Sequence, residues 1–75
     1  MAPISVPDTP FVQTLEHVRH DGGRRWRSAD GKRFYEWDEL HGEFEVYNKR
    51  GRHLGVVDQD GVATKDAVPG RSIDV

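Results

Sequence analysis

Residues 32–48 read KRFYEWDELHGEFEVYN and contain two short segments in which apolar and polar side chains alternate. Alternation with a period of two is typical of a β-strand that has one buried face. Gly42 lies between the two segments, where a turn would reverse the chain. We therefore predict two strands, over residues 32–38 and residues 43–48, that lie side by side in an antiparallel sheet.

Similar short segments lie on both sides of this pair. Residues 24–28 precede it and residues 53–58 follow it, and weaker strand patterns occur near residues 62–65 and 71–74. Dipeptides typical of tight turns divide these segments. They are Asp30-Gly31, Arg50-Gly51 and Asp60-Gly61. This order predicts an antiparallel meander.

The first residues differ in composition from the rest of the chain. Residues 1–9 hold two of the four prolines and few side chains that could pack, so we expect a flexible arm. Thr9 is a typical N-cap, and Pro10 suits the first position of a helix. The helix is expected to continue to about His20, before Gly22-Gly23, with Phe11, Leu15 and Val18 at helical spacing. The predicted fold class is thus α+β, mainly β, with a short N-terminal helix.

Length and composition exclude several classes of protein. A chain of 75 residues forms one small domain, here residues 10–75, with a modest core. It has no cysteine, which excludes a disulfide framework, a thiolate metal site and a cysteine nucleophile. No apolar run approaches the roughly 20 residues that span a bilayer, and residues 1–10 lack the pattern of a signal peptide. We therefore expect a soluble protein without a membrane partner.

The charged residues are unevenly distributed along the chain. The formal net charge of -2 gives no argument for binding a polyanion. However, basic residues cluster between residues 19 and 33 and again between residues 49 and 52, with acidic residues between the two clusters. A solvated, charge-balanced surface explains most such patterns. The alternative is contact with phosphates through Arg24, Arg25, Arg27, Lys49 and Arg52.

Strand alternation sorts the side chains onto two faces of the predicted sheet. The apolar face is expected to carry Tyr35, Trp37, Phe44, Val46, Leu54 and Val56. The opposite, open face is expected to carry Asp38, Glu43, Glu45, Tyr47 and His53, with His41 in the adjoining connection.

Clustered carboxylates next to histidines are electrostatically unfavourable, because like charges on adjacent strands repel. Two chemistries would explain such a surface. In general acid–base catalysis, a carboxylate takes a proton from a nucleophile and an imidazolium gives one to the leaving group. In a metal site, the ligands would be Asp38, His41, Glu43 and Glu45. The spacing alone does not separate the two chemistries.

A long series of motifs occupies most of the chain. It comprises Arg-Trp-Arg at 25–27, Lys-Arg-Phe-Tyr-Glu-Trp-Asp at 32–38, His-Gly-Glu-Phe-Glu at 41–45, Tyr47, and His-Leu-Gly at 53–55. In this order and spacing the motifs resemble the C-terminal cytotoxic domain of the ribosome-inactivating colicins and cloacin, from about Gly23 to Ile73. The string Tyr-Glu-Trp-Asp followed by His-Gly-Glu-x-Glu-x-Tyr is far more specific than an isolated glycine motif.

The resemblance implies a strongly twisted antiparallel sheet and an endoribonuclease that cuts small-subunit ribosomal RNA at the decoding site. It also implies a catalytic set of Asp38, His41, Glu45 and Arg71 that works without a metal or other cofactor. DNA, which lacks the 2′-hydroxyl, would not react. Further substrate-binding residues would be Glu43, Tyr47 and His53, of which the two rings could stack on an unpaired base or bind phosphate.

The resemblance further implies partners and a place of action. The partners would be the ribosome and an acidic immunity or antitoxin protein. The action would take place in the bacterial cytoplasm, and the domain would be secreted as part of a larger toxin. The cytotoxic domains of the family are strongly basic, whereas this chain is mildly acidic. Two alternatives remain open: a β-module that binds RNA or a ribosome through residues 24–27 and 49–52 without cutting it, and a metal-dependent nuclease.

Overall fold

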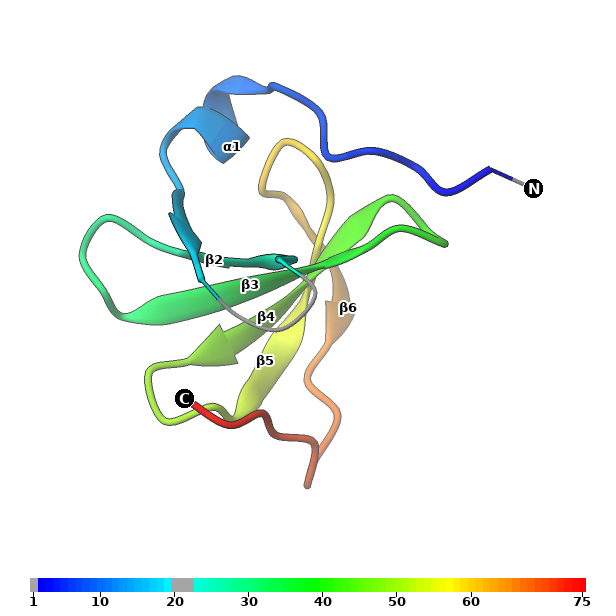
Figure 1. The fold of residues 1–75 in the computed structure, drawn as a ribbon. Coiled ribbons are helices and arrows are strands. Elements are labelled where there is room, and N and C mark those ends of the chain that lie inside the picture. Colours follow the sequence, from blue (N-terminus) through cyan, green and yellow to red (C-terminus); the bar gives the residue numbers. More distant parts are fainter. Residues whose placement is uncertain (1, 20–22) are drawn as a thin grey trace.

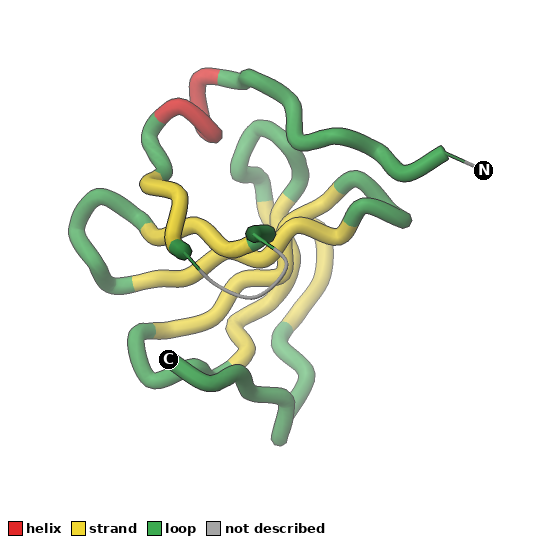
Figure 2. The backbone as a smooth tube through the Cα atoms, viewed as in Figure 1, coloured by secondary structure: helices red, strands yellow, loops and turns green. Residues whose placement is uncertain are grey.

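The computed structural model describes residues 2–19 and 23–75, which form one antiparallel sheet with a single short helix at its edge (Figure 1). The strands follow one another in chain order across the sheet, and Figure 2 shows them as a twisted layer. The elements are α1 (Pro10–Gln13), β1 (Glu16–Val18), β2 (Arg25–Arg27), β3 (Arg33–Asp38), β4 (Glu43–Asn48), β5 (His53–Val57) and β6 (Ala63–Asp66). The prediction of a small, mainly β domain with a short N-terminal helix is confirmed.

The central pair of strands, β3 and β4, matches the prediction from residues 32–48. The two strands pair along their whole length, from Arg33 opposite Asn48 to Asp38 opposite Glu43. At the turn between them, the Gly42 amide donates to the Asp38 carbonyl at 2.8 Å. Gly42 has φ +69°, a backbone conformation that residues other than glycine rarely adopt. The position of this glycine therefore fixes where the hairpin turns.

The core lies on one face of the sheet and is built from aromatic rings. Tyr35, Trp37, Phe44 and Val46 are buried together, and Phe44 is completely inaccessible to solvent. The Trp37 and Phe44 rings meet edge to face, with their centroids 4.8 Å apart. Phe11 of α1 packs against the same cluster. The alternation in β3 and β4 thus assigned the buried face correctly.

The predicted length of the helix is wrong. α1 ends at Gln13, where the Thr14 hydroxyl donates to the Phe11 carbonyl at 2.7 Å. Residues Glu16–Val18 form β1 instead, which pairs with β2. Three apolar residues at helical spacing provide a weak local preference, and pairing with a neighbouring strand outweighs it. His20 and Gly22, where we predicted the end of the helix, lie outside the described residues.

An irregularity in β5 overturns the predicted placement of Leu54 and Val56. Val46 pairs with Gly55 but Tyr47 pairs with His53, so Leu54 has no residue opposite it. A β-bulge of this kind shifts the alternation of side chains by one residue. Leu54 is 42% exposed, and Val56 lies opposite Glu45 on the face away from the core.

The backbone at Gly55 makes this bulge possible. Its φ is +144°, and a Cβ atom there would lie 2.6 Å from the carbonyl oxygen of Lys65 in the adjacent strand. Only glycine avoids that overlap. Val57 then takes the place in the apolar cluster that the sequence assigned to Val56.

Residues near each end of the chain, Ile4 and Ser72, bond to other parts of the fold. The Ile4 amide donates to the Glu39 carbonyl at 2.8 Å, and the Trp37 indole N–H donates to the Ile4 carbonyl at 2.7 Å. These contacts of the segment 1–9 were not predicted, and the domain boundary at residue 9 stays a prediction. At the other end, the expected strand over residues 71–74 is reduced to one bridge between Ser72 and Arg52.

Among the described residues, no helix has the length and apolar character that crossing a bilayer requires.

Candidate functional site

An open pocket of about 360 Å³ lies on the face of the sheet opposite the core. Six segments of the chain contribute to it: β3, the β3–β4 turn, β4, β5, β6 and the residues after β6. Its lining consists of Asp38, His41, Glu45, His53, Val56, Lys65, Asp66, Val68 and Arg71. All four residues of the expected catalytic set therefore border one space.

The turn after β3 holds His41 next to Asp38. His41 Nδ1 and Asp38 Oδ2 are 2.6 Å apart, and the other carboxylate oxygen accepts the backbone N–H groups of Leu40 and His41 at 2.9 and 3.2 Å. Partial burial acts to raise the pKa of Asp38, but the hydrogen bonds from the His41 ring and from these two amides outweigh it and lower the pKa. The Asp38 carboxylate is therefore ionised and orients the imidazole, whose Nε2 is left for other partners.

Glu45 receives two donors from other parts of the chain. Arg71 Nη1 donates to Glu45 Oε1 at 2.6 Å, and His53 Nε2 lies 3.1 Å from the same oxygen. The Glu45 side chain is 21% exposed and lines the pocket. A carboxylate oriented in this way can act as a base toward a bound hydroxyl.

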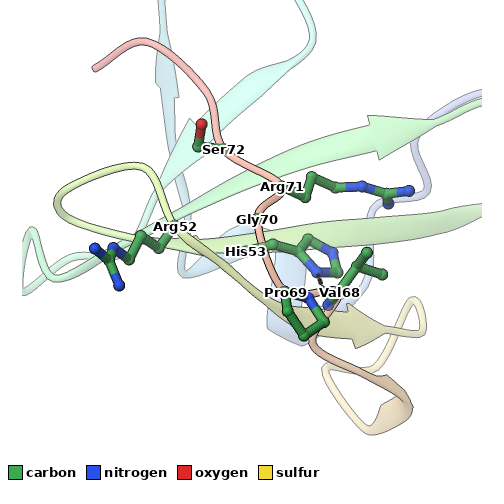
Figure 3. A pocket seen from close by; sticks show the side chains of 7 residues that line it. All are labelled: Arg52, His53, Val68, Pro69, Gly70, Arg71 and Ser72. Carbon is green, nitrogen blue, oxygen red and sulfur yellow. Dashed lines mark hydrogen bonds between the residues drawn. The ribbon is translucent and has the colours of Figure 1, made fainter.

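His53 lines the pocket, but its ring is buried. Its side chain has no exposed surface, because the residues that follow β6 cover it. Figure 3 shows the His53 ring next to Val68 and Pro69 of the segment 68–72. The ring also borders a second pocket, of about 470 Å³, which Arg52 and Ser72 line as well. The ring therefore has no face free to stack on a base.

Tyr47 is also unavailable as a stacking platform. It is 5% exposed, and its ring packs edge to face against His53 with the centroids 5.3 Å apart. Burial raises the pKa of Tyr47, with the negative charges of Glu36 and Glu45 adding to the effect. The expectation that this ring meets an unpaired base is wrong, because the ring is buried against His53.

The carboxylates of the acidic face are held by different donors. Glu43 accepts the Thr64 hydroxyl at 2.8 Å and lies 3.5 Å from Lys65 Nζ. Asp38 binds His41, and Glu45 is bound by His53 and Arg71, as described above. Within residues 2–19 and 23–75, no group of three or more His, Asp or Glu side chains is placed to hold a metal ion.

The residues predicted to contact phosphate differ in how available their side chains are. Arg25 is buried and donates to Glu36 at 2.8 and 3.0 Å and to the Asp74 carbonyl at 2.6 Å, so it stabilises the fold and offers nothing to a phosphate. Arg24 and Arg27 are half exposed and paired with Glu39 and Glu16. The exposed cations at the opposite end of β3 and β4 are Lys32, Arg33, Lys49, Arg50 and Arg52.

Several lining residues were missed by sequence reasoning. Val56, Lys65, Asp66 and Val68 reach the pocket only because β5 is bulged and β6 pairs with it, with Val56 opposite Lys65. The weak strand pattern near residues 62–65 placed β6 in the sheet but gave no register. Of these four residues, Lys65 is the one that carries a positive charge. Its side chain is exposed, and its Nζ lies 3.5 Å from Glu43 Oε1.

Comparison with known proteins agrees with this geometry. The model of the family named Cytotoxic matches residues 4–74, a longer stretch than the motifs from Gly23 to Ile73 had indicated. The chain is 37% identical to Colicin E3 of Escherichia coli over 73 residues, which cover 91% of this chain and 12% of that protein. Colicin-E6 and Cloacin, both of Escherichia coli, are each 41% identical over 56 residues, or 69% of this chain and 10% of the relative.

The chain thus spans about a tenth of the length of the curated relatives it matches. The match covers the turn that carries Asp38 and His41, the strand that carries Glu45 and the segment that carries Arg71. The resemblance drawn from the motifs is therefore confirmed: the chain belongs to the Cytotoxic family and is similar in sequence to part of Colicin E3, Colicin-E6 and Cloacin.

Proposed function

We propose that this chain is the nuclease domain of a bacterial toxin and that it cleaves RNA, with small-subunit ribosomal RNA at the decoding site as its substrate. One observation carries the proposal: His41, Glu45 and Arg71 border a single open pocket, with His41 oriented by Asp38 and Glu45 bound by Arg71. A base, an acid and a cation around one space are the groups that RNA cleavage without a metal requires.

The first step uses Glu45. Its carboxylate takes the proton of a ribose 2′-hydroxyl, and the 2′-oxygen attacks the adjacent phosphorus. The bond between the phosphorus and the 5′-oxygen of the next nucleotide then breaks. The products are a 2′,3′-cyclic phosphate and a 5′-hydroxyl.

The second group is His41, which protonates the departing 5′-oxygen through Nε2. Asp38 accepts a hydrogen bond from Nδ1, and this contact fixes the ring orientation and stabilises the imidazolium. The side chain of His41 is 57% exposed, so a bound strand can reach it directly.

Arg71 offsets the negative charge that develops on the phosphorane-like oxygens. Its side chain is 48% exposed. Within the described residues, Nη1 is the one guanidinium nitrogen that is hydrogen-bonded, and its partner is Glu45. The remaining N–H groups of the planar guanidinium can therefore bind phosphate oxygens while Nη1 keeps its contact with the base.

The similarity to colicins and cloacin supports further parts of the proposal. An immunity or antitoxin protein neutralises the domain. The domain is secreted within a larger toxin and acts in the cytoplasm of the target bacterium. DNA is not a substrate, because it has no 2′-hydroxyl to supply the nucleophile.

One experiment separates this proposal from its alternatives. Purified chain is incubated with bacterial ribosomes in excess chelator, and the ends of the small-subunit RNA are mapped for wild type, His41→Ala and Glu45→Ala. Cleavage at one site that persists in chelator and is absent in both variants supports the proposal. Cleavage that chelator abolishes would instead indicate a metal-dependent nuclease, and binding without cleavage would indicate an RNA-binding module.

A further inference from the structure

His53 is a buried polar residue whose two ring nitrogens are both bonded. Burying a polar group is unfavourable unless it is hydrogen-bonded, so the two partners of this ring are part of the reason it is tolerated in the interior. The Val68 backbone amide lies 2.9 Å from Nδ1, and Glu45 Oε1 lies 3.1 Å from Nε2. The side chain is fully enclosed, so water does not compete for either nitrogen.

These partners determine which nitrogen carries the hydrogen. A backbone N–H can only donate, so Nδ1 must accept from Val68. Nε2 is then protonated and donates to the Glu45 carboxylate. The ring is therefore fixed in one orientation and in the Nε2–H form.

The backbone of His53 binds the same C-terminal segment at a second point. Its amide donates to the Arg71 carbonyl at 3.0 Å, and its neighbour Arg52 forms the bridge to Ser72. His53 thus holds the segment 68–72 at Val68 through the ring and at Arg71 through the main chain. Arg71, placed by this segment, donates to the same oxygen of Glu45 that His53 binds.

We propose that His53 is a positioning residue that fixes the Glu45 carboxylate and the segment bearing Arg71 relative to each other. It does not touch the substrate, because its side chain is enclosed. Both donors bind Oε1, and no described residue donates to Oε2 of Glu45. The inference rests on the proposed function and specifies that Oε2 is the oxygen that takes the proton of the 2′-hydroxyl.

Two substitutions separate the two contacts of the ring. In His53→Asn the amide oxygen reaches the position of Nδ1, so the bond from Val68 is kept and the donor to Glu45 is lost. In His53→Gln the amide nitrogen reaches the position of Nε2, so the donor to Glu45 is kept and the acceptor for Val68 is lost. Leu54→Ala is the matched control, because Leu54 lies on the same strand, is 42% exposed and does not line the pocket.

Single-turnover cleavage of ribosomal RNA is the first measurement. His53→Asn is expected to lower kcat by about 10- to 100-fold, the effect of losing one hydrogen bond to a charged group, with KM within about twofold of wild type. His53→Gln is expected to retain more kcat than His53→Asn, and Leu54→Ala is expected to cleave at the wild-type rate. Equal rates for the two His53 variants, or a loss confined to KM, would overturn the positioning role.

The second measurement does not depend on activity. Nitrogen-15 NMR of the wild-type imidazoles is expected to show hydrogen on Nε2 and none on Nδ1 of His53 at pH 7. The Val68 amide is expected to exchange slowly with solvent in wild type and His53→Asn and faster in His53→Gln. A ring with hydrogen on Nδ1 would overturn the inference whether or not the chain cuts RNA, whereas the predicted NMR pattern in a chain without ribonuclease activity would contradict the proposed function alone.

Discussion

The two halves of the pocket are built in opposite ways. His41 is 57% exposed and takes its orientation from Asp38, only three residues earlier in the same turn. Glu45 is 21% exposed and is held by His53 and Arg71, which are 8 and 26 residues away in the chain. The acid of the proposed reaction thus depends on local structure, and the base depends on the tertiary fold. Substitutions in the two halves should therefore have different consequences for activity and stability.

The largest effect is expected for Glu45→Gln. The amide keeps the shape of the side chain but cannot accept the proton of the 2′-hydroxyl, so kcat should fall by about 10³- to 10⁴-fold. Single-turnover cleavage of ribosomal RNA, with KM determined in parallel, measures this loss. Activity within tenfold of wild type would show that Glu45 is not the base.

His41→Ala should lower kcat by about 10²- to 10³-fold, because the leaving 5′-oxygen loses its proton donor. The wild type should show a bell-shaped pH–rate profile, whereas the variant should lose the alkaline limb. Because the His41 side chain is exposed and bound only within the turn, the free energy of unfolding should change by no more than about 0.5 kcal/mol. A flat profile from pH 5 to 8 in the wild type would contradict the acid–base pairing.

Arg71→Ala tests the half of the pocket that is built around Glu45, because it removes the cation that binds this carboxylate. Loss of the guanidinium should lower kcat by about 100-fold, since charge on the phosphorane oxygens is no longer offset. Arg71→Lys restores a charge but not the planar fork of donors, so it should recover only part of this loss. Full activity of Arg71→Ala would exclude an electrostatic role at the pocket.

Asp38→Asn should have a smaller effect on the rate. The amide still accepts the backbone N–H groups of Leu40 and His41, but the charge-assisted contact with the His41 ring is lost, which corresponds to about a tenfold decrease in kcat. The pH–rate profile of the variant should lose part of its alkaline limb. An unchanged profile would mean that Asp38 does not stabilise the imidazolium.

The smallest expected effect is that of Asp38→Asn on the free energy of unfolding. The pKa of Asp38 is lowered in the folded chain, so its ionised form stabilises the fold above the pKa of the unfolded chain, and this stabilisation is lost as the pH falls through the folded pKa. At pH 7 Asp38→Asn should therefore be less stable than wild type by less than about 1 kcal/mol, because the side chain is partly exposed to solvent. The difference should shrink as the pH falls below the unfolded pKa of about 3.9 and vanish only below the folded pKa, which is lower. Urea unfolding at pH 7 and pH 3 measures it, and a constant difference would contradict the assigned direction of the shift.

The contrast between the two halves also explains what the sequence could predict. The β3–β4 hairpin, its turn at Gly42 and the proximity of Asp38 to His41 are local features, and alternation with a period of two revealed them. The motif resemblance added Glu45 and Arg71, which no local pattern connects. Both predictions place their residues at the same pocket.

The errors arose where tertiary contacts decide the outcome. Glu16–Val18 is a strand because β2 pairs with it. Arg25 was predicted to bind phosphate, but Glu36 and the Asp74 carbonyl take its guanidinium into the interior. Tyr47 and His53 lie on the predicted face, yet both are buried, and neither strand alternation nor charge pattern indicates this burial.

The bulge in β5 has a consequence for insertions and deletions in this family. His53 and Val56 both line the pocket although they are three positions apart in the chain. In a regular strand, side chains three positions apart point to opposite faces. A substitution that straightens the strand without removing a residue would turn either the histidine or the valine toward the aromatic core, whereas deleting one residue between them would remove the bulge and keep both on the pocket face. Relatives of the same length in this strand should therefore keep glycine at position 55, and a relative with a regular strand here should be one residue shorter between its counterparts of His53 and Val56.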